Sequence, residues 1–175
     1  MQIAVDAMGG DYAPDAVVAG AVRAAAQLQG LSKIILVGNT DAIKASFAAQ
    51  RLKIPERIAL QHASEVIGMD EAPANAVRRK KDSSISRAVD LVKAGQVRGM
   101  ISAGNTGAVV VAATLKLRPL AGIDRPAIAA VMPTPRKPFV LIDAGANTDC
   151  NPKMLLQFAA MGVVYAREIL GCDNP

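Results

Sequence analysis

The stretch QIAVDAMGGDYAPD, residues 2–15, decides the fold, because it contains a short apolar run, a polar turn with two glycines and the start of a helix. QIAVD (2–6) is typical of a short buried strand. Pro14 suits the first turn of a helix, and Asp15 complements the positive end of the helix dipole. Apolar residues then recur at helical spacing until Gly30. The stretch therefore predicts a strand, a loop and a helix.

The same order of elements recurs along the chain. Further strands are predicted at residues 33–37, 57–61, 97–101, 128–132 and 139–142. Further helices are predicted from residue 40 to about 52, from Pro73, from Ser84 to about 95, from about 108 to 117, and from Asn151 to 171. Alternating strands and helices predict a single α/β domain over residues 1–175, with a mostly parallel sheet.

Composition excludes several classes of protein. Hydrophobic residues make up 51% of the 175 residues, which argues against long disordered segments. Aromatic residues are only 3%, so the stacking platforms of single-strand nucleic-acid binders are lacking. The formal net charge of +5 favours anionic partners. Two cysteines, without zinc spacing, suggest a reduced, cytoplasmic setting. We expect neither a signal peptide nor a membrane span.

Three glycine-containing polar loops follow predicted strands, where parallel sheets bind ligands. The first, residues 6–11, places Gly9 and Gly10 before Asp11. Glycines allow positive φ and close approach of a ligand to the backbone. Aspartates that cap the turn explain the loop equally well, so both interpretations stay open.

The second loop, SAGNTGA (102–108), precedes a predicted helix, whose free N–H groups attract anions. Asn105 and Thr106, between Gly104 and Gly107, add side-chain donors. The motif is neither a Walker P-loop nor a dinucleotide fingerprint. Asn105 is equally typical of an ordinary N-cap, so anion binding and a simple turn remain alternatives.

The third loop, residues 143–149, carries Asp143, Asn147 and Asp149. Two aspartates can bind a metal through oxygen, but neither His nor Glu lies nearby, and a turn with a helix cap is favoured over a metal. We expect no metal and no cofactor. His62 is more typical of a structural histidine, and Cys150 of a buried, inert thiol.

The densest basic run is Arg78, Arg79, Lys80 and Lys81. Such a run on a helix is typically a solvated face. The alternative interpretation is a docking surface for an acidic protein. We expect Lys81, next to the capping residues 82–84, to point inward toward a loop.

Six motifs in order resemble the family of bacterial phosphate acyltransferases across essentially the whole chain. They are AVDAMGGDYAPD (4–15), MDEAPANAVRRKKDSS (69–84), SAGNTGA (102–108), GIDRPA (122–127), DAGANTDC (143–150) and LLQFAAMG (155–162). Members of the family are longer, and the chain resembles their N-terminal half. The resemblance implies the three-layer αβα fold of phosphotransacetylases and of isopropylmalate and isocitrate dehydrogenases.

The resemblance also implies a reaction: inorganic phosphate attacks a long-chain acyl-acyl carrier protein and yields acyl phosphate for phospholipid synthesis. Asn105 and Thr106 are expected to bind phosphate or the oxyanion, Lys81 to offset charge, and Asp143 and Asn147 to orient donors. Gly9, Gly10, Asp11, Gly104 and Gly107 are expected to form the substrate-binding walls. Arg78, Arg79 and Lys80 are expected to dock the acidic carrier protein.

The resemblance also implies a cytoplasmic homodimer that contacts the membrane peripherally. Three other functions remain to be weighed. A phosphotransacetylase-like enzyme would act on acyl-CoA instead. A nucleotide-binding dehydrogenase relative is disfavoured, since the dinucleotide fingerprint is missing. A basic nucleic-acid-binding module is disfavoured by the low aromatic content and by charge spread along the chain.

Overall fold

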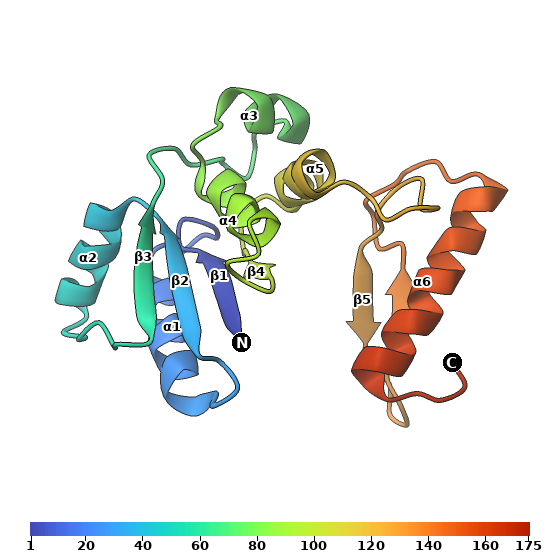
Figure 1. The fold of residues 1–175 in the computed structure, drawn as a ribbon, viewed down its shortest axis with the longest axis horizontal. Helices are drawn as coiled ribbons and strands as arrows, with labels where there is room; N and C mark the ends of the chain where they lie inside the picture. Colours follow the sequence, from blue (N-terminus) through green and yellow to red (C-terminus); the bar gives the residue numbers. More distant parts are fainter. The chain divides into compact units, whose positions relative to one another are not determined.

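A computed structural model describes residues 1–175 of the chain (Figure 1). The residues form two compact units, Met1–Arg118 and Pro119–Pro175. The grouping of both into one domain over residues 1–175 stays a prediction.

The first unit contains a four-stranded parallel sheet with the strand order β3-β2-β1-β4. Its strands are β1 (Gln2–Asp6), β2 (Lys33–Gly38), β3 (Ile58–His62) and β4 (Met100–Ile101). The prediction of an α/β fold with a mostly parallel sheet is confirmed. The predicted strand 97–101 is shorter than expected, but the Ala4 N–H still donates to the Gly99 carbonyl, so this segment runs alongside β1.

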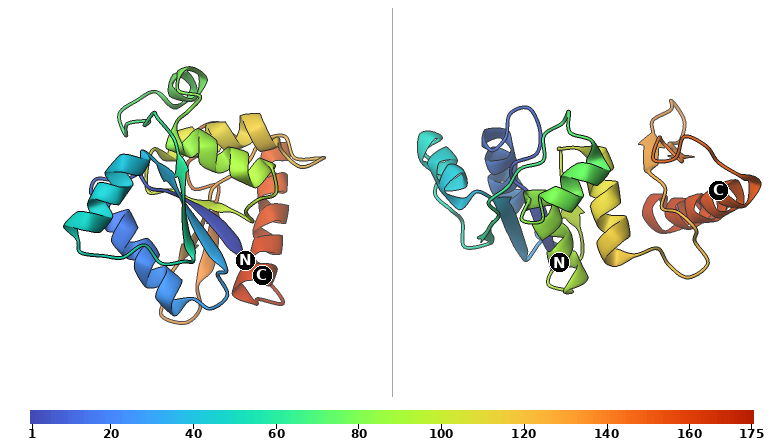
Figure 2. Two further views of the ribbon diagram at one scale, coloured as in Figure 1. Left: turned by 60° about the vertical axis from the view of Figure 1, so that its left-hand side comes forward. Right: turned by 90° about the horizontal axis from the view of Figure 1, so that it is seen from above.

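Helices cover both faces of this sheet (Figures 1 and 2). On one face lie α1 (Asp15–Gln27) and α2 (Thr40–Ala49), and on the other lies α4 (Ser84–Lys93). The helices α3 (Pro73–Arg79) and α5 (Thr106–Leu117) pack with one another, and α5 also packs on α4.

Side chains alternate along the central strand, and this alternation creates the layers. Ala4 faces α4 within a core that includes Ala88 and Val97. Ile3 and Val5 point to the opposite face and pack against the core beneath α1 and α2. The first unit therefore has three layers, with an apolar core on each face of the sheet.

Side-chain caps fix where the helices begin. Asn39, Ser83, Asn105 and Asn151 each accept backbone N–H groups in the first turn of the helix that follows. Each cap satisfies donors that would otherwise lack a partner, which explains why the helix starts were predictable.

The second unit contains the antiparallel strands β5 (Ala129–Met132) and β6 (Phe139–Ile142), followed by α6 (Pro152–Leu170). Gly171 ends α6 with a φ of 62°, in the left-handed region that favours glycine. The two strands were predicted, but they form a two-stranded sheet of their own. None of the helices has the length and hydropathy that a membrane span requires.

Candidate functional site

The strand order places two glycine loops at one position of the parallel sheet. From β1 the chain adds β2 and β3 on one side, and it then returns to place β4 on the other side of β1. Open parallel sheets bind ligands at such a switch point, beyond the carboxyl ends of the two strands. The loop after β1 (residues 7–14) and the loop after β4 (residues 102–105) both start there.

The two loops touch through their backbones. A Cβ atom on Gly9 would lie 2.6 Å from the Gly104 nitrogen, and one on Gly104 would lie 3.2 Å from the Gly9 Cα atom. Gly10 follows with a φ of 99°, which side-chain-bearing residues rarely adopt. Glycine is therefore required here because one backbone lies directly against another.

Several N–H groups of these loops lack a protein acceptor. The N–H groups of Gly9, Gly10, Thr106 and Gly107 make no hydrogen bond within the protein. Gly9 is buried, and buried N–H groups in folded proteins nearly always find a partner. Thr106 is exposed, and its hydroxyl is also free. The site can thus offer several donors to an anion.

Asn105 is fully engaged inside the protein. Its Oδ1 atom accepts the Ala108 N–H at 2.9 Å, so it is the N-cap of α5. Its Nδ2 atom donates to the carbonyls of Gly68 at 3.1 Å and Glu71 at 3.0 Å. Both hydrogens of the amide are occupied, so Asn105 holds the first turn of α5 against the 68–71 loop. Its expected direct contact with phosphate stays a prediction.

Gly107 brings a second helix close to the first turn of α5. A Cβ atom on Gly107 would lie 2.6 Å from the Cγ atom of Pro73, the first residue of α3. A side chain here would push α3 away, and the basic residues at the end of α3 would move with it.

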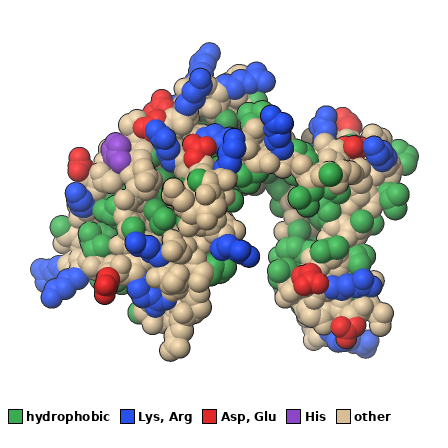
Figure 3. All heavy atoms as spheres, in the orientation of Figure 1, with side chains coloured by type: hydrophobic (Ala, Val, Ile, Leu, Met, Phe, Trp, Pro, Cys, Tyr) green, Lys and Arg blue, Asp and Glu red, His purple; other side chains and the backbone are tan.

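The basic run divides into free and engaged residues. Arg78, Arg79 and Lys81 are exposed, and basic side chains gather over α3 (Figure 3). Lys80 instead turns toward the preceding loop, where its Nζ atom donates to the Val66 carbonyl at 2.7 Å and pairs with Glu71.

The ion pair with Lys80, together with the Gly68 N–H, lowers the pKa of the Glu71 carboxyl below its ordinary value. The residue that contacts a loop is thus Lys80, whereas Lys81 has no ion-pair partner. The catalytic role expected of Lys81 stays a prediction.

Asp143 and Asn147 lie in the second unit and bind each other. The Asn147 main-chain N–H and side-chain Nδ2 donate to Oδ2 of Asp143 at 2.7 and 3.0 Å. The Ile128 N–H donates to Oδ1 at 2.7 Å, and the Asn147 amide also reaches the Pro126 carbonyl at 3.0 Å. This cluster fixes the loop after β6, and its expected role in orienting donors stays a prediction.

These hydrogen bonds predict a pH-dependent contribution to stability. Burial raises the pKa of the Asp143 carboxyl, but the donors of Ile128, Asn147 and Ala146 outweigh burial, so the pKa is lowered. A lowered pKa in the folded state stabilises it above the unfolded pKa, about 3.9, and the stabilisation is lost as the pH falls through the folded value. Asp143→Asn should therefore cost about 2 kcal/mol of unfolding free energy at pH 7.

The measurement is the free energy of unfolding of the native and Asp143→Asn proteins from about pH 7 down to about pH 3, which lies below the ordinary pKa of aspartate. The difference between them should shrink toward acid. Asp149→Asn is the control, since Asp149 is exposed and its side chain makes no hydrogen bond. A constant difference at all pH values would contradict the role given to the Asp143 charge.

The remaining candidate residues lie apart from the two glycine loops or at their exposed edge. Asp11 is exposed at the tip of the first loop. The Nδ1 atom of His62 lies 3.1 Å from the Thr40 hydroxyl, next to α2. Cys150 is exposed before α6, so the prediction that it is buried was wrong. No group of three or more His, Cys, Asp or Glu side chains is arranged to hold a metal ion.

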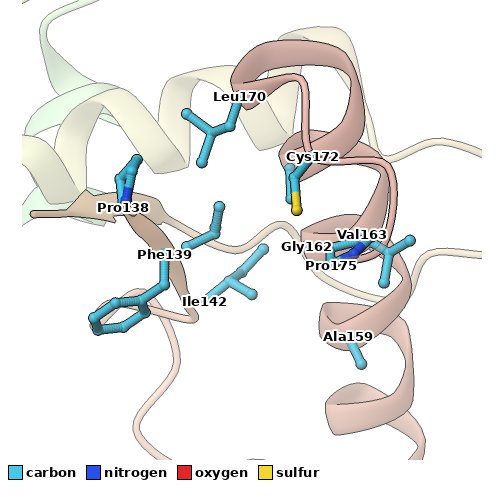
Figure 4. Close-up of a pocket in the computed structure, with 11 residues that line it drawn as sticks. Pro138, Phe139, Ile142, Ala159, Gly162, Val163, Leu170, Cys172 and Pro175 are labelled. Atoms are coloured by element: carbon cyan, nitrogen blue, oxygen red, sulfur yellow. The ribbon is translucent and has the colours of Figure 1, made fainter. Parts of the chain in front are cut away.

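An apolar pocket of about 360 Å³ lies in the second unit between β6 and α6 (Figure 4). Val140 and Ile142 line it from β6, and Ala159, Val163 and Leu170 line it from α6. It contains no ionisable side chain apart from Cys172.

Ser102 was not predicted to take part in the site, and Asp6 was predicted only to cap a turn. Asp6 is 1% exposed, and its Oδ2 atom accepts the Ser102 hydroxyl at 2.7 Å. The signal in the sequence is a polar residue directly after each of two apolar strands, but only the strand order shows that they meet.

Comparison with known proteins shows the family of the chain and relatives of similar fold. Residues 1–175 match the model of the family described as "Fatty acid synthesis protein". The chain is 50% identical over 175 residues to the phosphate acyltransferase of Geobacter sulfurreducens, covering 100% of this chain and 50% of that protein. It is 51% identical over 175 residues to the phosphate acyltransferase of Desulfitobacterium hafniense (strain DSM 10664 / DCB-2), covering 100% and 51%.

The fold is similar to that of the EutD phosphotransacetylase from Staphylococcus aureus, with a TM-score of 0.65 and 20% identity over 95% of this chain and 52% of that one. The chain spans about half the length of the curated relatives it matches. From the match over all its residues, we conclude that the chain belongs to the fatty acid synthesis protein family.

Proposed function

We propose that this chain forms the phosphate-binding part of a phosphate acyltransferase. The enzyme would transfer a long-chain acyl group from acyl-acyl carrier protein to inorganic phosphate, yielding acyl phosphate and free carrier protein. The observation that carries the proposal is the pair of glycine loops at the switch point, with unpartnered N–H groups at Gly9, Gly10, Thr106 and Gly107. The names of the relatives support the same reaction.

The chemistry suits a site that is rich in donors and poor in histidine. A phosphate oxygen attacks the thioester carbonyl carbon, the C–S bond breaks, and the carrier thiol leaves as a thiolate that takes up a proton. Phosphate is already anionic, so a strong general base is not required. Fixed N–H donors can hold the phosphate and the developing oxyanion. Such positioning is worth roughly 7–11 kcal/mol of a bimolecular barrier in favourable cases.

The candidate site residues of the first unit have distinct roles in this proposal. The N–H groups of both loops and the Thr106 hydroxyl contact phosphate or the oxyanion. Asn105 acts by holding the first turn of α5, because its side chain is engaged with the 68–71 loop. Lys81 offsets the charge of the bound anions.

The exposed end of α3 is the proposed docking surface for the acidic carrier protein. Arg78 and Arg79 are exposed, whereas Lys80 contributes from within its ion pair with Glu71. Reversing both charges, Arg78→Glu with Arg79→Glu, should raise KM for acyl-acyl carrier protein about tenfold at low salt and reduce its salt dependence.

The measurement is steady-state kinetics at two or more ionic strengths, with phosphate saturating. Lys44→Glu is the matched control, because Lys44 is exposed on α2, on the opposite face of the sheet. An unchanged KM in the double variant would make the basic run a solvated face only.

Acyl-phosphate formation tests the reaction itself. A protein of the relatives' full length that carries residues 1–175 is mixed with acyl-acyl carrier protein, with and without phosphate. We expect acyl phosphate only when phosphate is present, and lower rates for Lys81→Ala. If no acyl phosphate forms, the proposed function is wrong.

An enzyme acting on acyl-CoA is the second candidate, and the likeness to a phosphotransacetylase fold favours it. The same assay with acyl-CoA distinguishes the two. Higher kcat/KM for acyl-CoA than for acyl-acyl carrier protein would favour the second candidate.

A homodimer and a peripheral contact with the membrane also belong to the proposal, on the basis of the family resemblance. Analytical ultracentrifugation of the full-length protein tests the first, and flotation with anionic lipid vesicles tests the second. A monomer, or a protein that stays with the soluble fraction, would contradict the respective statement.

A further inference from the structure

One continuous chain of hydrogen bonds joins the two glycine loops. The Gly104 N–H donates to the Ser102 hydroxyl oxygen at 3.0 Å, and the Ser102 hydroxyl donates to Oδ2 of Asp6 at 2.7 Å. The other carboxylate oxygen of Asp6 accepts the Met8 N–H at 3.1 Å. The bond between Asp6 and Ser102 spans 96 positions of sequence. It links the end of β1 directly to the loop after β4.

The Asp6 carboxylate makes no side-chain hydrogen bonds other than those to Met8 and Ser102. It is 1% exposed, and a buried carboxylate is costly unless hydrogen bonds satisfy it. Its side-chain hydrogen bonds all come from the two loops. Oδ2 also lies 2.6 Å and 3.3 Å from where Cβ atoms on Gly9 and Gly104 would stand. The carboxylate therefore fills the space at the point where the two loops meet.

We propose that Asp6 and Ser102 are positioning residues that hold the N–H groups of one glycine loop in place relative to those of the other, and that they thereby set the affinity for phosphate. The inference rests on the proposed phosphate site. Neither side chain needs to touch phosphate.

Loops that are already fixed do not have to be ordered when the anion binds, and this pre-organisation is a gain in affinity. Once phosphate is bound, its own contacts hold both loops. Removing the Asp6–Ser102 bond should therefore affect phosphate binding more than the chemical step.

Kinetics of the full-length enzyme test the split between binding and chemistry. Ser102→Ala and Asp6→Asn should each raise KM for phosphate about fivefold, with kcat changed by less than about twofold. The double variant should resemble Ser102→Ala, because that substitution already removes the bond between Ser102 and Asp6.

Ser46→Ala is the matched control. It removes another part-buried hydrogen bond from a serine hydroxyl to an aspartate, between Ser46 on α2 and Asp15 on α1. It should lower the melting temperature by a similar amount and leave KM for phosphate unchanged. If Asp6→Asn does not fold, Ser102→Ala decides alone.

Amide hydrogen exchange separates this inference from the proposed reaction. The Met8 N–H donates to Asp6 and the Ala13 N–H donates to the Gly10 carbonyl, so Ser102→Ala in the neighbouring loop should speed their exchange, whereas Ser46→Ala should not affect Met8. Unchanged exchange at Met8 overturns the inference, and so does faster exchange with a native KM. If even the native protein forms no acyl phosphate, the proposed function fails, and exchange with calorimetric phosphate binding still decides the inference.

Discussion

Gly9→Ala is expected to lower phosphate-dependent turnover about 100-fold, because it separates the two loops of the site. The added methyl group would lie 2.6 Å from the Gly104 nitrogen and 2.6 Å from Oδ2 of Asp6. One of these neighbours is backbone and the other is a buried, hydrogen-bonded carboxylate, so neither can move at low cost. The loops must shift apart by a substantial fraction of an ångström. The measurement is kcat/KM for phosphate in the full-length enzyme, together with its melting temperature.

Gly20→Ala provides the control for this substitution. Gly20 lies on the exposed face of α1, and nothing is within 4 Å of the added methyl group. Alanine in a helix interior should stabilise the protein by about 0.5–1 kcal/mol relative to glycine, with activity unchanged. A Gly9→Ala enzyme with near-native turnover would show that the contact of the two loops is not needed for the reaction.

Asn105→Ala is expected to cost about 2–4 kcal/mol of unfolding free energy. The substitution removes the cap of α5, and it also leaves the carbonyls of Gly68 and Glu71 without their donor. Both ends of the amide act at once, so one residue secures a helix start and a separate loop. Denaturant unfolding measures the effect, and a raised KM for phosphate should accompany it.

Two further variants separate these roles. Asn39→Ala removes the cap of α2, where the side chain only accepts N–H groups, and should cost about 1 kcal/mol. Asn105→Asp keeps the oxygen that accepts the Ala108 N–H but loses the N–H donors. Its free energy of unfolding should therefore lie between those of the native protein and Asn105→Ala. If Asn105→Ala costs no more than Asn39→Ala, the hold on the 68–71 loop contributes nothing.

The predictable part of this fold is the part that neighbouring residues determine. Asn39, Ser83, Asn105 and Asn151 cap helices through N–H groups two or three residues away, and each cap was visible in the sequence. Strand positions were predictable for the same reason, since alternation and apolar runs are local patterns. The pairing of β5 with β6 apart from the parallel sheet was not, because pairing depends on partners elsewhere in the chain.

The candidate site was predictable only in part. Its glycines and Thr106 stood out as residue types suited to anion binding. The engagement of the Asn105 amide with the 68–71 loop, and the meeting of Asp6 with Ser102, depend on contacts across 34 and 96 positions of sequence. From the sequence, Lys81 was predicted to face a loop, but Lys80 is the lysine that does so. The turn at the end of α3 decides which of the two adjacent lysines reaches Glu71, and the sequence pattern does not show that turn.

The position of β1 between β2 and β4 has a consequence for how the protein is made. During synthesis the ribosome releases β1, β2 and β3 well before β4, so one edge of β1 waits without a partner. An unpaired strand edge is prone to join other chains. Because the loop after β1 rests on the loop after β4, the candidate site can form only after residues 102–105 have emerged. Slow emergence of residues 63–100 would thus favour aggregation before any activity appears.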